Sequence, residues 1–439
     1  MPAWAKPMSM PATGFRSAAT GRGELTAMAG IQRLNSKPLL YRLHSQRPAT
    51  LVLMVITFAR CQLTLANGWR RHRKAGIDCL SQGKARPICR SKIGNRRLPR
   101  TAIMTWLDNS RILAIFAVMF LHVAAIVVTG TEIGSLYWWA GNLYDSALRW
   151  CVPVFVMISG ALLLDPAKAE DMKTFYAKRA SRISAPLVFW SLVYLAWNAF
   201  KTVMAGNQFA PMSLLRGLAS GKPHYHMWFL YMLVVLYLFT PFFRMIARSA
   251  TRAEIGTITF LSFAIAALNS VVTALYPSGP SLFVNWFLSY IPYYFLGYLI
   301  TITDVRAPRA MPWTALALSI AATAVGCRLL ARYQSLDAGL YFYNYLSITV
   351  IPTSICVMFL LKEWNKPFIS SKAARTLSRL TLGVYLIHPI IFETLSDFVV
   401  TPFDYQPALA VPLLTITVYA SSLAVAWAIA KTPWMNRTI

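Results

Sequence analysis

From residue 112 to residue 430 the sequence consists of long apolar runs separated by short charged segments. A run of about twenty apolar residues is what an α-helix needs to cross a hydrocarbon core roughly 30 Å thick. The whole chain is 56% hydrophobic and only 13% charged, and its apolar residues are not spaced as on an amphipathic helix. The sequence therefore predicts an all-α polytopic membrane protein.

About ten transmembrane helices are expected, and they should form one bundle with a cavity near the membrane midplane. The Lys and Arg residues of the connecting segments alternate from one side to the other: the connections after the second and eighth runs contain five each, counting Arg379 at the start of the ninth run, and those after the fifth and ninth contain none. Since positive residues are retained in the cytoplasm, both termini are expected there. The expected spans are residues 112–129, 138–164, 183–203, 226–243, 255–275, 283–302, 311–330, 341–361, 377–398 and 407–430.

Residues 1–103 form a different kind of sequence from the membrane domain expected over residues 104–439. Residues 1–100 contain 19 Lys and Arg against two acidic residues, which gives +17 of the net charge of +28. Their apolar run at residues 51–59 is too short to span a bilayer. The basic clusters suit anionic membrane lipid, and nucleic acid is not an expected partner because aromatic residues are not interleaved with them. We expect a disordered extension or an untranslated upstream segment, with Met104 as an alternative start.

The first apolar run is opened by Arg111 and contains His122 eleven residues later. Eleven helical residues turn through about 1100° and rise roughly 16 Å, so the two side chains share a face and His122 lies near the midplane. An ionisable group at that depth indicates a functional site, and the alternative is a histidine hydrogen-bonded to a neighbouring helix. Asp108, just before this run, is expected to cap the helix.

Three cations, Lys178, Arg179 and Arg182, cluster in the loop before the third run. Guanidinium groups pair well with phosphates, so the cluster suits a phosphorylated ligand at the cytoplasmic entrance. The same residues also satisfy the positive-inside rule without any ligand.

Candidate acceptor-binding residues lie in several other runs. His226 and Trp228 belong to a segment rich in histidine and aromatic residues where the chain enters the fourth run, which suits a carbohydrate, although aromatic residues also gather at membrane interfaces. Arg149 precedes Pro153, which predicts a kink in the second run, and Arg149 is expected either to meet a polar acceptor or to anchor the interface. His388 lies nine residues beyond the basic end of the ninth run, again at membrane depth.

The six cysteines show no spacing typical of a metal site or a disulfide framework, so no metal is expected. Glycine motifs that cradle phosphates are also missing from the sequence, so an ATP-driven transporter is not supported.

Four blocks of the sequence are informative together. They are Leu107-Asp108-x-x-Arg111 with His122, residues 152–160, Tyr225-His226-x-Trp228-Phe229, and residues 378–388 with Gly383, Tyr385 and His388. In this order, over about residues 104–430, the chain resembles acyltransferase family 3 of bacterial inner-membrane proteins, particularly the branch that includes the O-acetyltransferase of enterobacterial common antigen. Ile112 departs from the family, which usually has glycine after the arginine.

The resemblance implies an inner-membrane O-acyltransferase that takes an acyl group, usually acetyl, from cytoplasmic acetyl-CoA. The acceptor would be a hydroxyl of a cell-surface polysaccharide or a lipid-linked sugar. Arg111 would then bind the CoA phosphates together with Lys178, Arg179 and Arg182. His122 would act as general base or as a transient acyl carrier. The residues expected at the acceptor are Arg149, His226, Trp228, Tyr385 and His388.

A proton-coupled transporter or flippase of a sugar or lipid-linked intermediate is the competing interpretation. Glu393 and Asp397 in the ninth run are the main candidates for proton carriage. Such carriers often consist of paired halves, and the sequence shows no convincing internal repeat.

Overall fold

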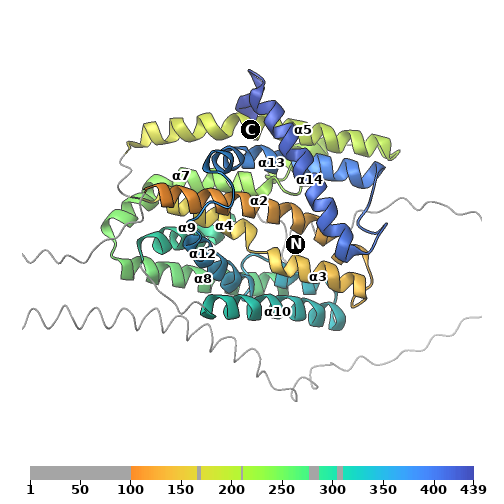
Figure 1. The fold of residues 1–439 in the computed structure, drawn as a ribbon, viewed down its shortest axis with the longest axis horizontal. Helices are drawn as coiled ribbons and strands as arrows, with labels where there is room; N and C mark the ends of the chain where they lie inside the picture. Colours follow the sequence, from red (N-terminus) through yellow and green to blue (C-terminus); the bar gives the residue numbers. More distant parts are fainter. Residues whose placement is uncertain (1–99, 166–169, 209–210, 276–285, 304–309) are drawn as a thin grey trace, which may run out of the picture. The chain divides into compact units, whose positions relative to one another are not determined.

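A computed structural model of the chain describes residues 100–439 except 166–169, 209–210, 276–285 and 304–309. The expectation for the basic N-terminal extension falls almost entirely outside the described residues. Within them, all regular structure is helical (Figure 1). The helices are α2 (Arg100–Gly130), α3 (Leu136–Leu148), α4 (Cys151–Leu163), α5 (Met172–Met204), α6 (Met212–Ala219), α7 (Trp228–Ser249), α8 (Arg252–Leu275), α9 (Trp286–Ile302), α10 (Ala310–Tyr333), α11 (Leu336–Gly339), η3 (Leu340–Tyr343), α12 (Val350–Glu363), α13 (Ser371–Phe398), α14 (Pro407–Lys431) and η4 (Met435–Thr438).

Seven helical segments of the described part are long and apolar enough to cross a membrane. They confirm the expected all-α membrane class. The expected runs at α9, α12 and α13 correspond to shorter or less apolar helices, so the count of ten spans stays a prediction. The seven are Thr105–Gly130, Leu136–Leu163 (α3 and α4 together), Met172–Met204, Trp228–Ser249, Arg252–Val271, Ala310–Tyr333 and Pro407–Lys431.

Helix α2 runs through the middle of the bundle, where it contacts α3, α4, α12, α13 and α14 (Figure 1). Its apolar residues surround the whole helix, which is the pattern of a helix buried on all sides. The side-chain amide of Asn109 donates hydrogen bonds to the backbone carbonyls of Trp364 and Lys366, at 3.4 and 2.9 Å. These bonds fix the end of α2 that carries Arg111 against the connection between α12 and α13.

The prediction that Asp108 caps this helix is wrong, because α2 already begins at Arg100. The sequence of residues 100–107 contains neither glycine nor proline and continues the helix. Asp108 is buried in the helix interior, and its Oδ1 atom lies 3.7 Å from Nη1 of Arg111. The carboxylate of Asp108 therefore pairs with Arg111 and does not cap the helix.

The second expected span consists of two helices, α3 and α4, which meet at Arg149 and Trp150. Pro153 is the third residue of α4. In the first turn of a helix the backbone N–H groups have no partner within the helix, so proline is tolerated there. The expected kink is thus a two-residue interruption at Arg149 and Trp150, just before the helical turn that contains the proline. The Arg149 side chain, at this interruption, is fully buried.

Helices α4 and α9 make the most extensive helix–helix contact of the described part. A Cβ atom at Gly160 would overlap the backbone of Tyr294, and one at Gly297 would overlap the backbone of Met157. Small residues permit such close backbone approach between membrane helices. Glycine at these two positions therefore sets the distance between the two helices.

The eighth expected span, residues 341–361, is helical over only part of its length. After η3 the chain is irregular until α12 begins at Val350. The Asn344 side chain accepts a hydrogen bond from the Leu346 N–H (2.9 Å), and Ser347 Oγ accepts one from the Val350 N–H (3.2 Å). Polar side chains here replace the helical hydrogen bonds that an apolar run would need.

Candidate active site

The cations expected in a loop before the third span instead lie on α5. The helix begins after Asp171, whose side chain accepts a hydrogen bond from the Thr174 N–H at 3.0 Å. Its 33 residues give a length of about 50 Å, more than a hydrocarbon core of roughly 30 Å. Arg179 and Arg182 are three residues apart and share a face, whereas Lys178 points about 100° away from Arg179.

Arg111, Arg179 and Arg182 all lie within electrostatic range of one tyrosine. Electrostatic interactions connect the Tyr237 side chain with all three guanidinium groups. The Arg179 guanidinium lies 5.9 Å from the centre of the Tyr237 ring and 5.2 Å from that of Phe175. Its Nε atom is buried and has no hydrogen-bond partner among the described residues. Three guanidinium groups with an unused buried donor fit a phosphate-bearing ligand. We call these three arginines the cationic group.

Lys178 is not part of the cationic group. Its side chain is 55% exposed, and its Nζ atom lies 2.7 Å from Oε2 of Glu170. The hydrogen bond from Lys178 lowers the pKa of Glu170, so the carboxylate is ionised at neutral pH. Arg244 Nη2 lies 3.8 Å from the other oxygen of Glu170. The lysine is therefore already paired with a carboxylate.

His122 adjoins a small cavity of about 20 Å³. This volume has room for about one water molecule. Four residues expected at the site, from α2, α7, α13 and the segment before α7, meet at its walls. The polar and aromatic residues of the lining are His122, Cys151, His226, Trp228, Phe229, Tyr345 and Tyr385.

His388 lies next to the cavity, where its ring packs between two histidines. The ring centres lie 5.4 Å from His122 and 5.6 Å from His226. Pro389 has no N–H to donate to the carbonyl of Tyr385 four residues earlier, so that carbonyl is free within α13. Nδ1 of His388 lies 2.8 Å from this oxygen. The carbonyl that Pro389 leaves free on α13 thus orients the imidazole ring of His388.

The segment before α7 is fixed against α13. The Tyr385 hydroxyl donates a hydrogen bond of 2.5 Å to the backbone carbonyl of His226. Trp228 packs on Tyr290 of α9 and stacks on Tyr345, with ring centres 5.7 and 6.0 Å apart. These contacts position both His226 and Trp228 from three separate parts of the chain.

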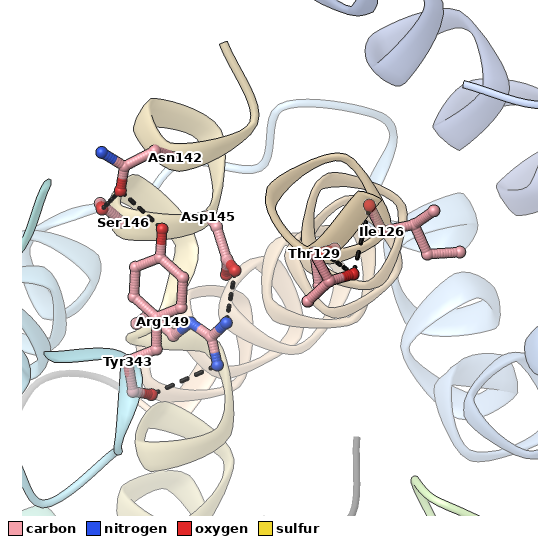
Figure 2. A network of polar contacts seen from close by, with 8 residues as sticks. Ile126, Thr129, Asn142, Asp145, Ser146, Arg149 and Tyr343 are labelled. Carbon is pink, nitrogen blue, oxygen red and sulfur yellow. Dashed lines mark hydrogen bonds and ion pairs between the residues drawn. The ribbon is translucent and has the colours of Figure 1, made fainter. Parts of the chain in front are cut away.

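Arg149 lies behind the cavity wall rather than at it. Figure 2 shows its guanidinium between Asp145 and Tyr343: Nη2 lies 2.5 Å from Oδ2 of Asp145, and Nη1 donates to the Tyr343 carbonyl at 3.2 Å. Arg149 and Asp145 are both fully buried. A hydrogen bond also connects Arg149 with Tyr345, which lines the cavity. The arginine therefore positions a cavity residue and does not itself line the cavity.

The sequence alone did not single out His224, and it indicated Glu393 only as a carrier of protons. Nε2 of His224 lies 3.0 Å from Oε1 of Glu393, and its Nδ1 lies 3.1 Å from Nδ1 of His226. The close spacing of His224 and His226 was a signal that could have indicated the histidine pair. The carboxylate partner, Glu393, is on α13, far along the chain, and could not be found in the same way.

Comparison with known proteins gives one match. A family model described as an acyltransferase domain matches residues 104–431, a segment that contains both the cationic group and the cavity. No curated protein and no solved structure matches the chain.

Proposed function

Because the chain belongs to the acyltransferase family whose domain model spans residues 104–431, we propose that it is a membrane-embedded O-acyltransferase. In this proposal it moves an acyl group, acetyl in the simplest case, from cytoplasmic acyl-CoA to a hydroxyl of a cell-surface glycan or lipid-linked sugar. The observation that carries the proposal is that one helix, α2, joins a cationic group at Arg111 to a histidine-lined cavity at His122.

The cationic group supplies the donor end of the proposed site. Arg111, Arg179 and Arg182 bind the phosphates of CoA, and the unpartnered Nε atom of Arg179 supports this assignment. The acyl-CoA supplies the activated thioester. Helix α2 then leads over a rise of about 16 Å from the phosphate-binding arginines to His122.

His122 supplies the chemistry at the cavity. Within the described residues its ring makes no hydrogen bond and is held only by ring contacts, such as those with Tyr225 and His388 at 5.1 and 5.4 Å. A ring nitrogen is therefore available to take a proton from the acceptor hydroxyl or to carry the acyl group briefly.

The acceptor end consists of His226, Trp228, Tyr385 and His388. Aromatic faces around a polar centre suit a sugar ring, and Arg149 fixes the neighbouring wall through Tyr345. We place the protein in the bacterial inner membrane with ten spans and both termini in the cytoplasm. This orientation follows from the charge alternation and lets the cationic group meet a cytoplasmic donor.

The test is transfer of radiolabelled acetate from acetyl-CoA to glycan in membranes that contain the full chain. His122→Ala should lower transfer at least about 100-fold, the usual contribution of a proton-transferring side chain, and Arg111→Ala should raise the KM for acetyl-CoA. Thr129→Ala is the matched control on α2, because its hydroxyl bonds only to the backbone of its own helix (Figure 2).

Transfer by His122→Ala at the wild-type rate would show that this residue is not at the centre of the reaction. If substitutions changed uptake or export of the sugar while its acetylation stayed constant, the carrier interpretation would replace the enzyme.

A further inference from the structure

Three side chains form a line that ends at the cavity. Glu393 on α13 lies 3.0 Å from Nε2 of His224, measured from its Oε1 atom, and Nδ1 of His224 lies 3.1 Å from Nδ1 of His226. Nε2 of His226 is buried and has no hydrogen-bond partner among the described residues, while His226 itself lines the cavity. The line therefore connects a carboxylate to an unused ring nitrogen beside the cavity.

The Glu393 carboxylate is held firmly at the far end of this line. Its Oε2 atom accepts hydrogen bonds from Nζ of Lys201 at 2.5 Å and from Nε1 of Trp197 at 2.7 Å. The neighbouring cation keeps the carboxylate ionised, and the other oxygen, Oε1, lies at an ion-pair distance of 3.0 Å from Nε2 of His224. Tyr194 stacks on the His224 ring with the ring centres 4.4 Å apart, which fixes its plane.

The positions of the protons follow from these partners. Burial lowers the pKa of His224 although Glu393 opposes the shift, so the ring carries a single proton at neutral pH. An ionised carboxylate only accepts hydrogen bonds, which places that proton on Nε2 of His224 and leaves its Nδ1 bare. Two unprotonated nitrogens cannot form a hydrogen bond with each other, so Nδ1 of His226 carries a proton and donates it to Nδ1 of His224. Nε2 of His226 then presents a lone pair beside the cavity.

We propose that His226 is the general base for the acceptor hydroxyl, with His224 and Glu393 as positioning residues that fix its tautomer and stabilise its protonated form. The inference rests on the proposed acyl transfer and assigns to His226 the base role considered for His122.

In the proposed step, the O–H bond of the acceptor breaks and the proton moves to Nε2 of His226. The oxygen forms a bond to the acyl carbon while the bond from that carbon to its leaving group breaks, either the thiol sulfur or a nitrogen of His122. The proton then passes from Nε2 of His226 to the sulfur anion. This yields the free thiol and restores the neutral ring, so no other reactant is required.

The tautomer can be measured without any acyl transfer. Full-length protein labelled with ¹⁵N-histidine is reconstituted in liposomes, and the His226 signals are identified by their loss in His226→Gln. Solid-state NMR should show a protonated Nδ1 and a bare Nε2 for His226 at neutral pH. In Glu393→Gln the side-chain amide can donate to Nε2 of His224, which should reverse both tautomers. A protonated Nε2 on His226 in the wild type would overturn the inference.

The kinetic test uses the labelled-acetate assay in membranes. Glu393→Gln should lower kcat about 100-fold to 10,000-fold and leave the KM for acetyl-CoA within about two-fold. Glu393→Asp should restore part of the rate. Asp397→Asn makes the same change of carboxylate to amide one turn further along α13, at an exposed position, and should leave transfer unchanged.

The pH profile distinguishes a base from a purely structural residue. Wild-type transfer should fall as the pH drops and Nε2 of His226 becomes protonated, and His226→Gln should lose this dependence together with most of its rate. Wild-type kcat and pH profile in both His226→Gln and Glu393→Gln would overturn the inference while leaving the acyltransferase intact. No transfer by the wild type would instead overturn the proposed function.

Discussion

The buried pair of Asp145 and Arg149 joins two charges that each depend on the other. Neither side chain has any exposed surface, and the guanidinium also packs 4.3 Å from the centre of the Tyr343 ring. Removing one partner leaves an uncompensated charge in an apolar interior, whereas replacing both leaves none.

Asp145→Leu is therefore expected to lower the free energy of unfolding by about 3–5 kcal/mol, and the double variant Asp145→Leu/Arg149→Met should recover most of that loss. Unfolding of the purified protein in detergent, followed by tryptophan fluorescence, measures both. Equal stability of the single and double variants would show that the charge balance is unimportant.

The arginines of α5 differ from their lysine neighbour in what they contact. Arg179 has an unpartnered buried donor, while Lys178 is paired with Glu170. A hydrogen bond between a charged donor and phosphate contributes about 1.5–3 kcal/mol, so Arg179→Ala should raise the KM for acetyl-CoA roughly 10-fold to 150-fold. Lys178→Ala should raise it less than about three-fold. Labelled-acetate transfer at varied acetyl-CoA concentrations measures the KM of both variants. A larger rise in KM for Lys178→Ala than for Arg179→Ala would contradict the assignment of Arg179 to the phosphates.

Some residues of the candidate site were visible in the sequence, and others were not. His122, His226 and Trp228 stood out because polar or aromatic side chains at a particular membrane depth need an explanation, and the structure brings them to one cavity. Tyr345 reaches the cavity from the segment between η3 and α12, and the pairing of His224 with Glu393 depends on how α13 packs against the segment before α7. No local pattern in the sequence encodes that contact.

At the scale of helices, α4 and α9 are held at a distance that only glycine permits. Gly160→Ala would force its Cβ atom into the backbone of Tyr294, and neither helix can yield by a side-chain rotation. Overpacking of this kind costs about 1–3 kcal/mol, and we expect a corresponding loss of thermal stability in detergent. Gly217→Ala, whose Cβ would meet its nearest neighbours at 3.6 Å, is the control and should be neutral. Equal melting temperatures of Gly160→Ala and the wild type would rule out the close contact with the backbone of Tyr294.

Apolar runs located the helices well because a membrane helix must satisfy its backbone within itself. They failed where the backbone found other partners. The break at Trp150 joins two helices inside one apolar run, and the segment around Asn344 and Ser347 replaces helical hydrogen bonds by side-chain bonds. Hydropathy reports the side chains and is insensitive to both features.

For the whole molecule, the first residue that the candidate site requires is Arg111. A chain that starts at Met104 keeps Arg111 and the Asn109 contacts to the α12–α13 connection. It should retain acetyl transfer within about two-fold of the full chain, since every residue assigned to the proposed site lies at Arg111 or beyond it. A chain that starts at Ile112 should be inactive. Loss of transfer by the chain that starts at Met104, at equal protein levels in the membrane, would contradict this view.

The cavity between His122 and His226 has room for about one water molecule, although the proposed reaction joins reactants from both sides of a membrane. The proposed reaction therefore requires the helices to separate and admit each reactant, because among the described residues the cavity at His122 is closed down to about the size of one water molecule. If the proposed transfer takes place at this cavity, a bilayer that contains the protein is expected to keep its ion gradients between turnovers, because the two compartments would exchange an acyl group without sharing an open passage.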